Sequence, residues 1–485
     1  MSIGTMLILF FWIIDPGLKG RFKKLTIENP ASWMIGLYVI HLIWLFGTSD
    51  FGYAAKDLRI KLPLLVLGVS LGTIAISRIE LRKVFIALGA GVTLATLVGY
   101  YLYFSDPMIK MDPRSMAPGI SHIRLSLISA VLIAGVFYFW RDFDKSWRFI
   151  ALGVVVNTLV FLYTLQTLTT IAVFIAGIGT LIFIKVSSIA GAKGRLVIVA
   201  PLLIIALIAL VNLRKDYSNY FELSENALPL LDRSPSGNIY HHSDTSQIEN
   251  GNYVFANIVP AEIVATWNER SSLKISDDPA ERGVNYARLV RYLTAKGVPK
   301  DKEGVESLSP EDIENIEAGF PAPVYADKDG LSLRLHTFLH GTHLYLEKDV
   351  VAGSSFYQRF VYWSIGASIA KSNYLFGVGT GDVKTAFQEA YLDFPVRIDP
   401  KYQLRAHNQY ITFLVTFGVI GLFYFLMMLK STFKKWKANS LFTFFIVAAI
   451  ISFTTEDTLE TQAGVTFFAF FLSLFSAADL THQNS

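Results

Sequence analysis

Residues 405–410, RAHNQY, combine a guanidinium, an imidazole and two amides beside an apolar run. That run, residues 411–429, is long enough at about 20 residues to cross a bilayer. An imidazole can exchange protons near neutral pH, and a guanidinium binds phosphate or carboxylate groups. Polar residues crowded at a membrane edge are costly and usually functional, although such residues also anchor helix ends at the interface. The stretch is a candidate for proton transfer and anion binding, with interfacial anchoring as the alternative.

Two further arginines stand near the ends of apolar runs. Arg124 is the only charged residue in residues 120–138 and follows His122 by two positions. Its guanidinium could fork onto a phosphate at the outer leaflet, or the side chain could snorkel to the interface. Arg359 opens the run RFVYW, and its alternative is a surface salt bridge. Acids near a membrane usually need partners, so these arginines could pair with three acids between the last two apolar runs: Glu456, Asp457 and Glu460.

Two other patterns suggest chemistry more weakly. His336, His340 and His343 are spaced to share one helix face and could bind a metal ion. No Glu follows His336, so the zinc-protease pattern fails, and a partly exposed helix explains the three equally well. Residues 377–382, GVGTGD, lack the Lys-Ser/Thr of a phosphate-binding P-loop. They predict a turn after a helix, whose amides could still meet an anion.

The composition indicates a membrane protein. Of 485 residues, 52% are hydrophobic and only 17% are charged, with a mean hydropathy of +0.43; soluble domains carry about 25% charged residues. The chain has no cysteine, which excludes disulfides and thiolate metal sites. Residues 214–406 hold 20 Lys/Arg and 26 Asp/Glu, a net charge of −6, whereas the rest carries +10. No basic cluster of the nucleic-acid-binding kind appears in this acidic segment.

About eleven apolar runs could span the bilayer, and basic residues cluster in alternate loops between them. The side rich in Lys and Arg is the cytoplasmic one, so the large polar segment faces outward. We therefore predict an all-α polytopic membrane protein with three parts: N-terminal membrane helices at 1–213, a large, mainly helical periplasmic domain at 214–406, and C-terminal membrane helices at 407–485. The predicted spans are 3–14, 31–47, 58–76, 84–104, 123–140, 149–165, 170–184, 196–213, 408–429, 441–453 and 464–475.

Within the outward segment, helices are predicted at residues 285–295, 331–345 and 361–370. Ser309 and Pro310, followed by two acids, have the pattern of a helix start. Residues 234–238, SPSGN, have the composition of a turn. Strong sheet patterns and tandem repeats are not evident.

In their order along the chain, these motifs resemble the O-antigen ligase and O-antigen polymerase family of bacterial envelope proteins. In that family a His-Asn pair stands at the end of the long periplasmic loop, as His407 and Asn408 do here. Residues 373–379, NYLFGVG, resemble the family's Asn-Pro-Leu-x-Gly-x-Gly turn, and Arg359 with Trp363 resembles the pair ahead of it. Shorter likenesses complete the match and favour a ligase-like subgroup: KLPLL at 61–65, SHIRLSL at 121–127, GNIY at 237–240, ENGNY at 249–253 and EDTLETQAG at 456–464.

The chain departs from the family pattern in two places. Family members often have about twelve spans, against about eleven here. Many carry a Ser-Arg motif on an outer turn midway along the chain, but residues 165–170 read LQTLTT. A phosphate contact from that arginine cannot be carried over, and Arg124 or Arg405 are the conjectured substitutes.

The resemblance implies transfer of a glycan from a polyprenyl-diphosphate-linked donor to an acceptor hydroxyl. The acceptor would be an envelope glycolipid such as lipid A-core, and the site would lie on the periplasmic face of the bacterial inner membrane, without cofactor or metal ion. His407 would take the acceptor proton and Arg359 would stabilise the leaving diphosphate, so both are predicted as catalytic. The predicted substrate-binding residues are His122, Arg124, Arg405 and Asn408.

Two alternatives stay open. A polymerase of the same family would join two lipid-linked glycans. A transporter or flippase also needs polar residues among its spans, but it would be expected to show an internal repeat or spans broken by Gly or Pro in matching halves. The sequence shows neither pattern clearly.

Overall fold

The computed structural model describes residues 3–106, 109, 113–165, 167–327, 337–343, 355–394, 400–433 and 439–478. The chain forms two compact units, the first made of Met1–Arg195 with Val351–Ser485 and the second of Leu196–Val350. The fold is mostly helical, as predicted. Helix α9 (Leu168–Phe221) starts in the first unit and ends in the second.

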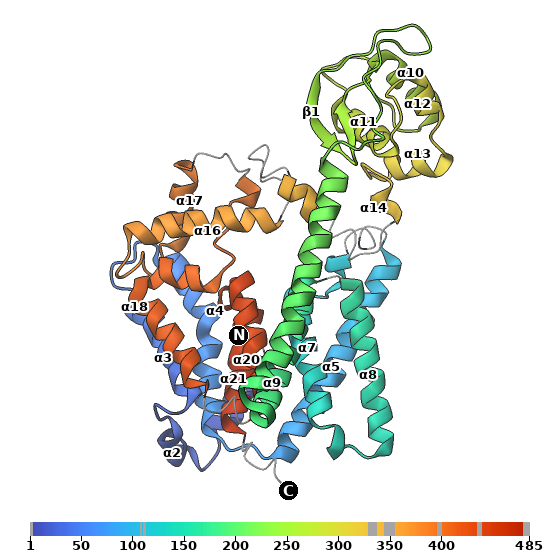
Figure 1. Ribbon diagram of the computed structural model, residues 1–485. Helices are drawn as coiled ribbons and strands as arrows, with labels where there is room; N and C mark the ends of the chain where they lie inside the picture. The colour runs from blue at the N-terminus through green and yellow to red at the C-terminus, as the bar shows by residue number, and fades with distance from the viewer. Residues whose placement is uncertain are drawn as a thin grey trace. The chain divides into compact units, whose positions relative to one another are not determined.

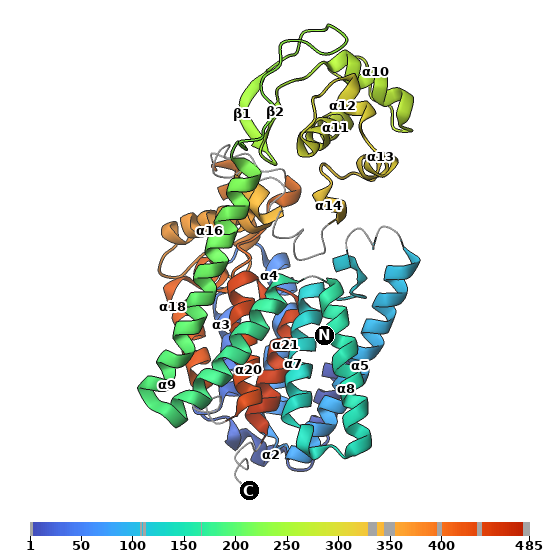
Figure 2. The ribbon, with the colours of Figure 1, turned by 45° about the vertical axis from the view of Figure 1, so that its right-hand side comes forward.

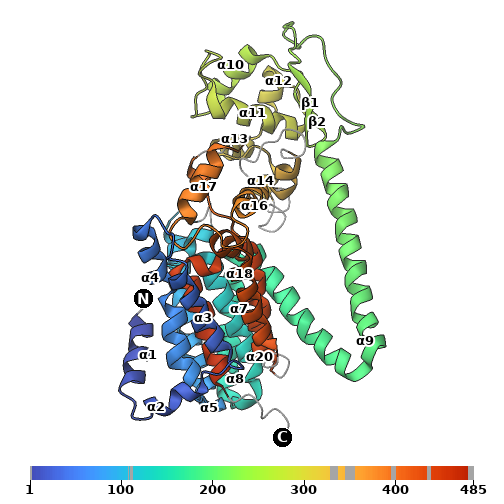
Figure 3. The same ribbon diagram turned by 90° about the vertical axis from the view of Figure 1, so that its left-hand side faces the viewer.

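The first unit is a bundle of helices (Figures 1 and 3). Helices α3 and α4 pack on each other, and α21 packs on both. The elements besides α9 are α1 (Ile3–Ile13), α2 (Leu18–Arg21), η1 (Phe22–Lys24), α3 (Pro30–Ile43), α4 (Phe51–Ser70), η2 (Leu71–Thr73), α5 (Arg78–Ser105), η3 (Pro113–Met116), α7 (His122–Tyr138), η4 (Trp140–Asp142), α8 (Lys145–Leu165), α16 (Ser355–Ser372), α17 (Val383–Leu392), η5 (Pro400–Tyr402), α18 (Gln409–Ser431), α20 (Ser440–Thr455), η6 (Thr458–Glu460) and α21 (Gln462–Ala477).

Four helices among the described residues are long and apolar enough to cross a membrane: α5, α8, the Leu168–Ser187 part of α9, and α18. Five shorter apolar helices accompany them, α1, α3, α7, α20 and α21. The prediction of a multi-pass membrane protein is confirmed. The count of eleven spans and the outward placement of the large segment remain predictions.

Aromatic side chains fill the centre of the bundle. Phe442, Phe445 and Phe453 of α20 are fully buried, and Phe445 packs against Phe468 of α21 with ring centroids 6.1 Å apart. Side chains that face lipid gain no hydrophobic stabilisation from burial, so van der Waals packing and polar contacts carry helix association in a membrane. The close aromatic packing holds α20 and α21 together and fixes the short connection between them.

Helix α18 is interrupted at Gly418, where φ is 64° and ψ is −164°. The turn that follows α16 fits against this break. The amides of Val378 and Gly379 donate to the carbonyls of Val415 and Thr416, each at 2.9 Å, and the amide of Val419 donates to the carbonyl of Tyr374 at 3.0 Å. A break at membrane depth needs such partners.

These contacts bear on two sequence predictions. The predicted turn at residues 377–382 is present, and the amides of Val378 and Gly379 are already bonded within the protein rather than open to an anion. The sequence analysis found no spans broken by Gly or Pro in matching halves, and the single break at Gly418 of α18 does not by itself make such a pair.

The second unit is mainly helical around a small apolar core, with Trp267, Tyr292 and Leu293 almost fully buried. The helix predicted at 285–295 is α11, and the Ser309 start is a capping box with Asp312. Of the helix predicted at 331–345, residues 337–343 are described and helical, and the rest lies outside the described residues. The elements besides the end of α9 are β1 (Asp244–Glu249), β2 (Asn252–Phe255), α10 (Pro260–Arg270), α11 (Gly283–Lys296), α12 (Lys302–Glu306), α13 (Pro310–Glu317) and α14 (Val324–Asp327).

The hairpin of β1 and β2 was not predicted. The strands are antiparallel and lie beside α11 (Figure 2). Asn250 and Gly251 join them with φ values of 52° and 73°. An Asn-Gly pair is the strongest short hairpin motif because both residues tolerate positive φ, so the sequence did carry the information.

The two units divide the chain at other places than the predicted parts 1–213, 214–406 and 407–485. Residues 351–406, with α16 and α17, belong to the first unit rather than to the large insert. The predicted parts describe membrane topology, which this division leaves open.

Candidate active site

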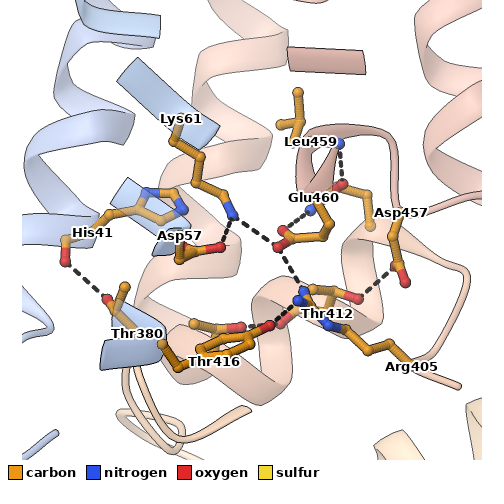
Figure 4. Close-up of polar contacts among 12 residues, drawn as sticks. His41, Asp57, Lys61, Thr380, Arg405, Thr412, Thr416, Asp457, Leu459 and Glu460 are labelled. Atoms are coloured by element: carbon orange, nitrogen blue, oxygen red, sulfur yellow. Dashed lines mark hydrogen bonds and ion pairs between the residues drawn. The ribbon is translucent and has the colours of Figure 1, made fainter. Parts of the chain in front are cut away.

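The connection between α20 and α21, residues 456–460, carries three acids with almost no exposure. We call this segment the acidic turn. A buried carboxylate must be paired or hydrogen-bonded, and each of these acids binds a different set of residues. The acidic turn thereby collects side chains from α4, α7, α16 and the stretch just before α18; Figure 4 shows part of this arrangement.

Asp457 fixes the backbone ahead of α18. Its carboxylate accepts hydrogen bonds from the amides of His407 and Asn408, both at 3.0 Å, and from the Thr412 hydroxyl at 2.6 Å. Burial raises the pKa of the Asp457 carboxyl above its usual value, although the charge of His407 and the Thr412 bond oppose the rise. His407 has φ of 46°, which residues other than glycine seldom adopt. The Asp457 contacts hold that conformation.

Asn408 is the N-cap of α18. Its side-chain oxygen accepts from the amides of Tyr410 and Ile411 at 3.0 and 3.2 Å, and its Nδ2 donates to the carbonyl of Thr454 at 3.1 Å. These bonds satisfy amides that a helix start leaves open. Both ends of the Asn408 amide are therefore engaged within the protein, and the imidazole of His407 stands just outside the helix.

Glu456 joins His407 to Arg359. Its Oε2 lies 3.3 Å from Nδ1 of His407, and its Oε1 accepts from Nη2 of Arg359 at 2.9 Å. Burial raises the pKa of the Glu456 carboxyl, but the His407 hydrogen bond and the charges of His407, Arg359 and Arg124 outweigh burial, so the pKa lies below its usual value. The ring of Tyr362, also on α16, lies 5.7 Å from the His407 ring. Glu456 is ionised at neutral pH.

Glu460 is the centre of a second set of contacts (Figure 4). It pairs with Lys61 of α4 and with Arg405, each at 2.7 Å, and accepts from Gln409 at 3.1 Å. Lys61 is 1% exposed and also pairs with Asp57 at 2.6 Å. Burial raises the pKa of the Glu460 carboxyl, but the charges of Lys61 and Arg405 outweigh it and hold the pKa well below its usual range. Breaking one partner of such a buried pair is strongly destabilising.

A small pocket lies beside the Glu460 contacts. Its empty space is about 200 Å³. The guanidinium of Arg405 also contacts the Tyr53 ring, with 5.5 Å from Cζ to the ring centroid. The residues that line this pocket are mostly polar and come from α3, α4, α17, α18, the turn after α16, the stretch before α18 and the acidic turn: His41, Tyr53, Asp57, Lys61, Thr380, Val383, Arg405, Thr416, Phe417 and Glu460.

Arg124 reaches the acidic turn from α7. The residue is 3% exposed, and its Nη2 lies 3.5 Å from the carbonyl of Asp457, at the limit of a hydrogen bond. Its Nε and Nη1 are buried and have no hydrogen-bond partner among the residues that the structure describes. Guanidinium nitrogens seldom stay buried without partners. Arg124 therefore keeps donors available for an anion.

The structure brings five of the six predicted site residues together. Arg124, Arg359, Arg405, His407 and Asn408 all contact the acidic turn, Asn408 through its backbone amide. The predicted pairing of Arg124 and Arg359 with the three acids is present for Arg359, which pairs with Glu456. Arg405, for which no such pairing was predicted, pairs with Glu460. The sixth, His122, is the first residue of α7.

Sequence reasoning missed three contributors: Tyr53, Asp57 and Lys61. Asp57 and Lys61 are spaced by four residues at the start of the predicted span 58–76, with Asp57 just before it, and this spacing places them on one helix face. Charged residues inside a span are rare and mark functional sites. That spacing was the available pattern, and the KLPLL motif already included Lys61.

The histidines of the second unit make a separate cluster. His340 Nε2 lies 3.0 Å from Nη2 of Arg291 and 3.5 Å from Glu249, while His343 stacks on Phe221 with ring centroids 4.4 Å apart. His336 lies outside the described residues. Among the residues described, no group of three His, Asp or Glu side chains is arranged to hold a metal ion. The weak metal hypothesis gains no support, and the predicted independence of metal stays a prediction.

Residues 332–426 match the model of the O-antigen ligase family. This part of the chain is similar to O-antigen ligases. The matched segment contains α16, the turn after it, Arg405, His407, Asn408 and the first part of α18. The resemblance inferred from the motifs is thereby confirmed. No curated protein matches the chain.

Proposed function

We propose that this protein transfers a glycan from a polyprenyl-diphosphate-linked donor to a hydroxyl group of an envelope glycolipid, such as lipid A-core, at the outward face of the inner membrane. The O-antigen ligase match supports a glycosyltransferase-type function in the envelope. One observation is the main support for the proposed active site. Three separate segments deliver a histidine and three arginines to one acidic turn: Arg124, Arg359, Arg405 and His407.

His407 is proposed as the general base. Nδ1 of His407 lies against the Glu456 carboxylate. Nε2 of the same ring has no hydrogen-bond partner among the residues that the structure describes. The side chain is 28% exposed, so a substrate can reach it. A neutral imidazole in this position can accept the proton of an acceptor hydroxyl at Nε2 as that oxygen attacks the sugar.

The arginines are proposed to hold the donor diphosphate. The two open donors of Arg124 supply what a phosphate oxygen needs, and binding would relieve the cost of burying them without partners. Arg359 and Arg405 already pair with Glu456 and Glu460, so they would share their charge between the acidic turn and the donor. Fixed guanidinium groups stabilise the charge that develops on a leaving diphosphate, and the proposed reaction needs no metal ion.

The location suits a lipid-linked donor. His407 and Arg405 immediately precede α18, a helix long and apolar enough to cross a membrane. A polyprenyl tail stays in the bilayer, so its diphosphate head is presented where such a helix ends. The outward orientation, and with it the periplasmic placement of residues 214–406, belongs to this proposal.

The test is transfer by purified protein in liposomes that contain a polyprenyl-diphosphate-linked glycan and lipid A-core. Glycan should appear on the acceptor, with release of polyprenyl diphosphate, and the rate should survive excess chelator. Lengthening of lipid-linked glycan without any acceptor would indicate a polymerase instead. A rate that chelator abolishes and magnesium restores would contradict the metal-independent part of the proposal.

A further inference from the structure

The conformation of His407 is set by the acidic turn rather than by its own helix. A left-handed backbone at a residue other than glycine persists only where neighbouring groups enforce it, and such residues cluster at functional sites. Here Asp457 enforces it by binding the two consecutive amides of His407 and Asn408. The backbone constraint leaves the ring to be oriented by a different group.

That group is Glu456. Each oxygen of its carboxylate has a different partner, Nδ1 of His407 on Oε2 and Nη2 of Arg359 on Oε1. An ionised carboxylate only accepts hydrogen bonds, so the imidazole nitrogen facing it must carry the proton. The neutral ring then has its lone pair at Nε2, which is the nitrogen that the protein leaves open. At catalytic sites, a carboxylate that accepts a hydrogen bond from one ring nitrogen of a histidine often fixes which nitrogen carries the proton.

We propose that Glu456 is the positioning residue of His407, and that the two act as a carboxylate–imidazole dyad. This inference rests on the proposed function. The acceptor oxygen forms its bond to the anomeric carbon while the bond from that carbon to the diphosphate oxygen breaks. The acceptor proton passes to Nε2, the electron pair leaves on the lipid diphosphate, and Glu456 stabilises the resulting imidazolium.

Other charged and titratable groups contact His407 or bind the same acidic turn. Asp457 bonds its backbone, and the remaining groups lie on α7, on α16 and just before His407 in the chain: Arg124, Arg359, Tyr362 and Arg405. Three of these groups are cations. Glu456 is the anion in direct contact with the ring, so its charge is the one whose removal should change the proton affinity of the base most.

The experiment measures kcat against pH and donor binding for Glu456→Gln, Glu456→Asp, His407→Ala and the Glu456→Gln/His407→Ala double variant. Glu456→Gln should lower kcat by about 10- to 100-fold, a part of the general-base contribution. It should also move the acidic limb of the profile to lower pH by about one unit, because an opposite charge near a base favours its protonated form. Glu456→Asp, which keeps the charge, should leave the limb close to its wild-type position.

The double variant separates positioning from a structural role. If Glu456 acts through the imidazole, Glu456→Gln should add little to the loss caused by His407→Ala. If the kcat losses of the two single variants multiply in the double variant, and the acidic limb of Glu456→Gln stays at its wild-type pH, the dyad is wrong while His407 can still be the base. A wild-type rate in His407→Ala would instead overturn the proposed function itself. Glu460→Gln is the control for the pH limb alone. It removes a carboxylate of the same turn that pairs with Lys61 and Arg405 rather than with His407, so the limb should stay in place in the fraction that size-exclusion chromatography shows to be folded, even though the variant is less stable.

Discussion

Replacement of Gly418 by alanine tests whether the break in α18 is built into the fold. A Cβ atom added at Gly418 would lie 2.2 Å from the carbonyl oxygen of Leu375 and 2.6 Å from the amide nitrogen of Phe376. Both neighbours are backbone atoms, so no side chain can rotate away. The backbone at Gly418 also lies in a region that essentially only glycine adopts, where strain amounts to about 1–3 kcal/mol.

The expected loss of stability follows from these contributions. Backbone strain and overpacking each amount to about 1–3 kcal/mol, and the bonds between the two segments weaken by about 1 kcal/mol each if the turn moves away. We therefore expect Gly418→Ala to destabilise the protein by about 3 kcal/mol or more. Thermal unfolding in detergent, followed by a fluorescent probe, would report this as a midpoint several degrees below wild type.

Gly91→Ala is the matched control for Gly418→Ala. Gly91 is an exposed helical glycine of α5, and a Cβ there would meet nothing within 4 Å. Alanine should raise the midpoint slightly, because glycine in a helix interior is about 0.5–1 kcal/mol less favourable. A Gly418→Ala midpoint equal to that of Gly91→Ala would refute the account of the break.

Three further predictions test the site, the second unit and the topology. Arg359→Ala should weaken donor binding, measured with labelled donor, and Arg359→Lys should restore it poorly because an ammonium cannot make the planar fork; full rescue by lysine would mean that charge alone suffices. Burial raises the pKa of the Glu249 carboxyl, but its interactions with His340 and Arg291 outweigh burial and lower the pKa to about 2. The contribution of Glu249 to the free energy of unfolding should therefore be complete above the ordinary pKa of 4.5 and lost as pH falls toward 2. Urea titrations should show this loss in wild type and not in Glu249→Gln. Cysteine at Ser272 should react with an impermeant maleimide in intact spheroplasts while cysteine at Arg141 should not, and the reverse pattern would invert the topology.

Part of the site was predictable because residues able to transfer protons or bind phosphate stand at the predicted membrane boundary. Arg359, Arg405 and His407 are polar residues near the ends of apolar runs, and acids at the same level had to find partners among them. The pairing of particular residues was not predictable. Arg359 pairs with Glu456 and Arg405 pairs with Glu460 because of how α16 and α18 pack, and no local sequence pattern encodes these pairings.

Two features of the fold show the same limit. The hairpin at Asn250 and Gly251 was encoded locally and could have been predicted from that pair. The break in α18 could not, since Gly418 lies within an apolar run where glycine is common in membrane helices. The break depends on the turn at residues 373–379, which lies about 40 residues earlier in the chain and supplies the amides and carbonyl that satisfy it. Long-range backbone pairing of this kind is a tertiary property.

The measurement that tests the central claim most directly is the pair of transfer rate and donor affinity for purified His407→Ala, with folding checked by size-exclusion chromatography. Loss of a general base typically lowers the rate by about 10²–10⁴-fold. We predict a loss in that range with donor affinity close to wild type. A wild-type rate, or a defect confined to donor affinity, would contradict the base role and place His407 among the phosphate ligands or the residues that only hold the acidic turn.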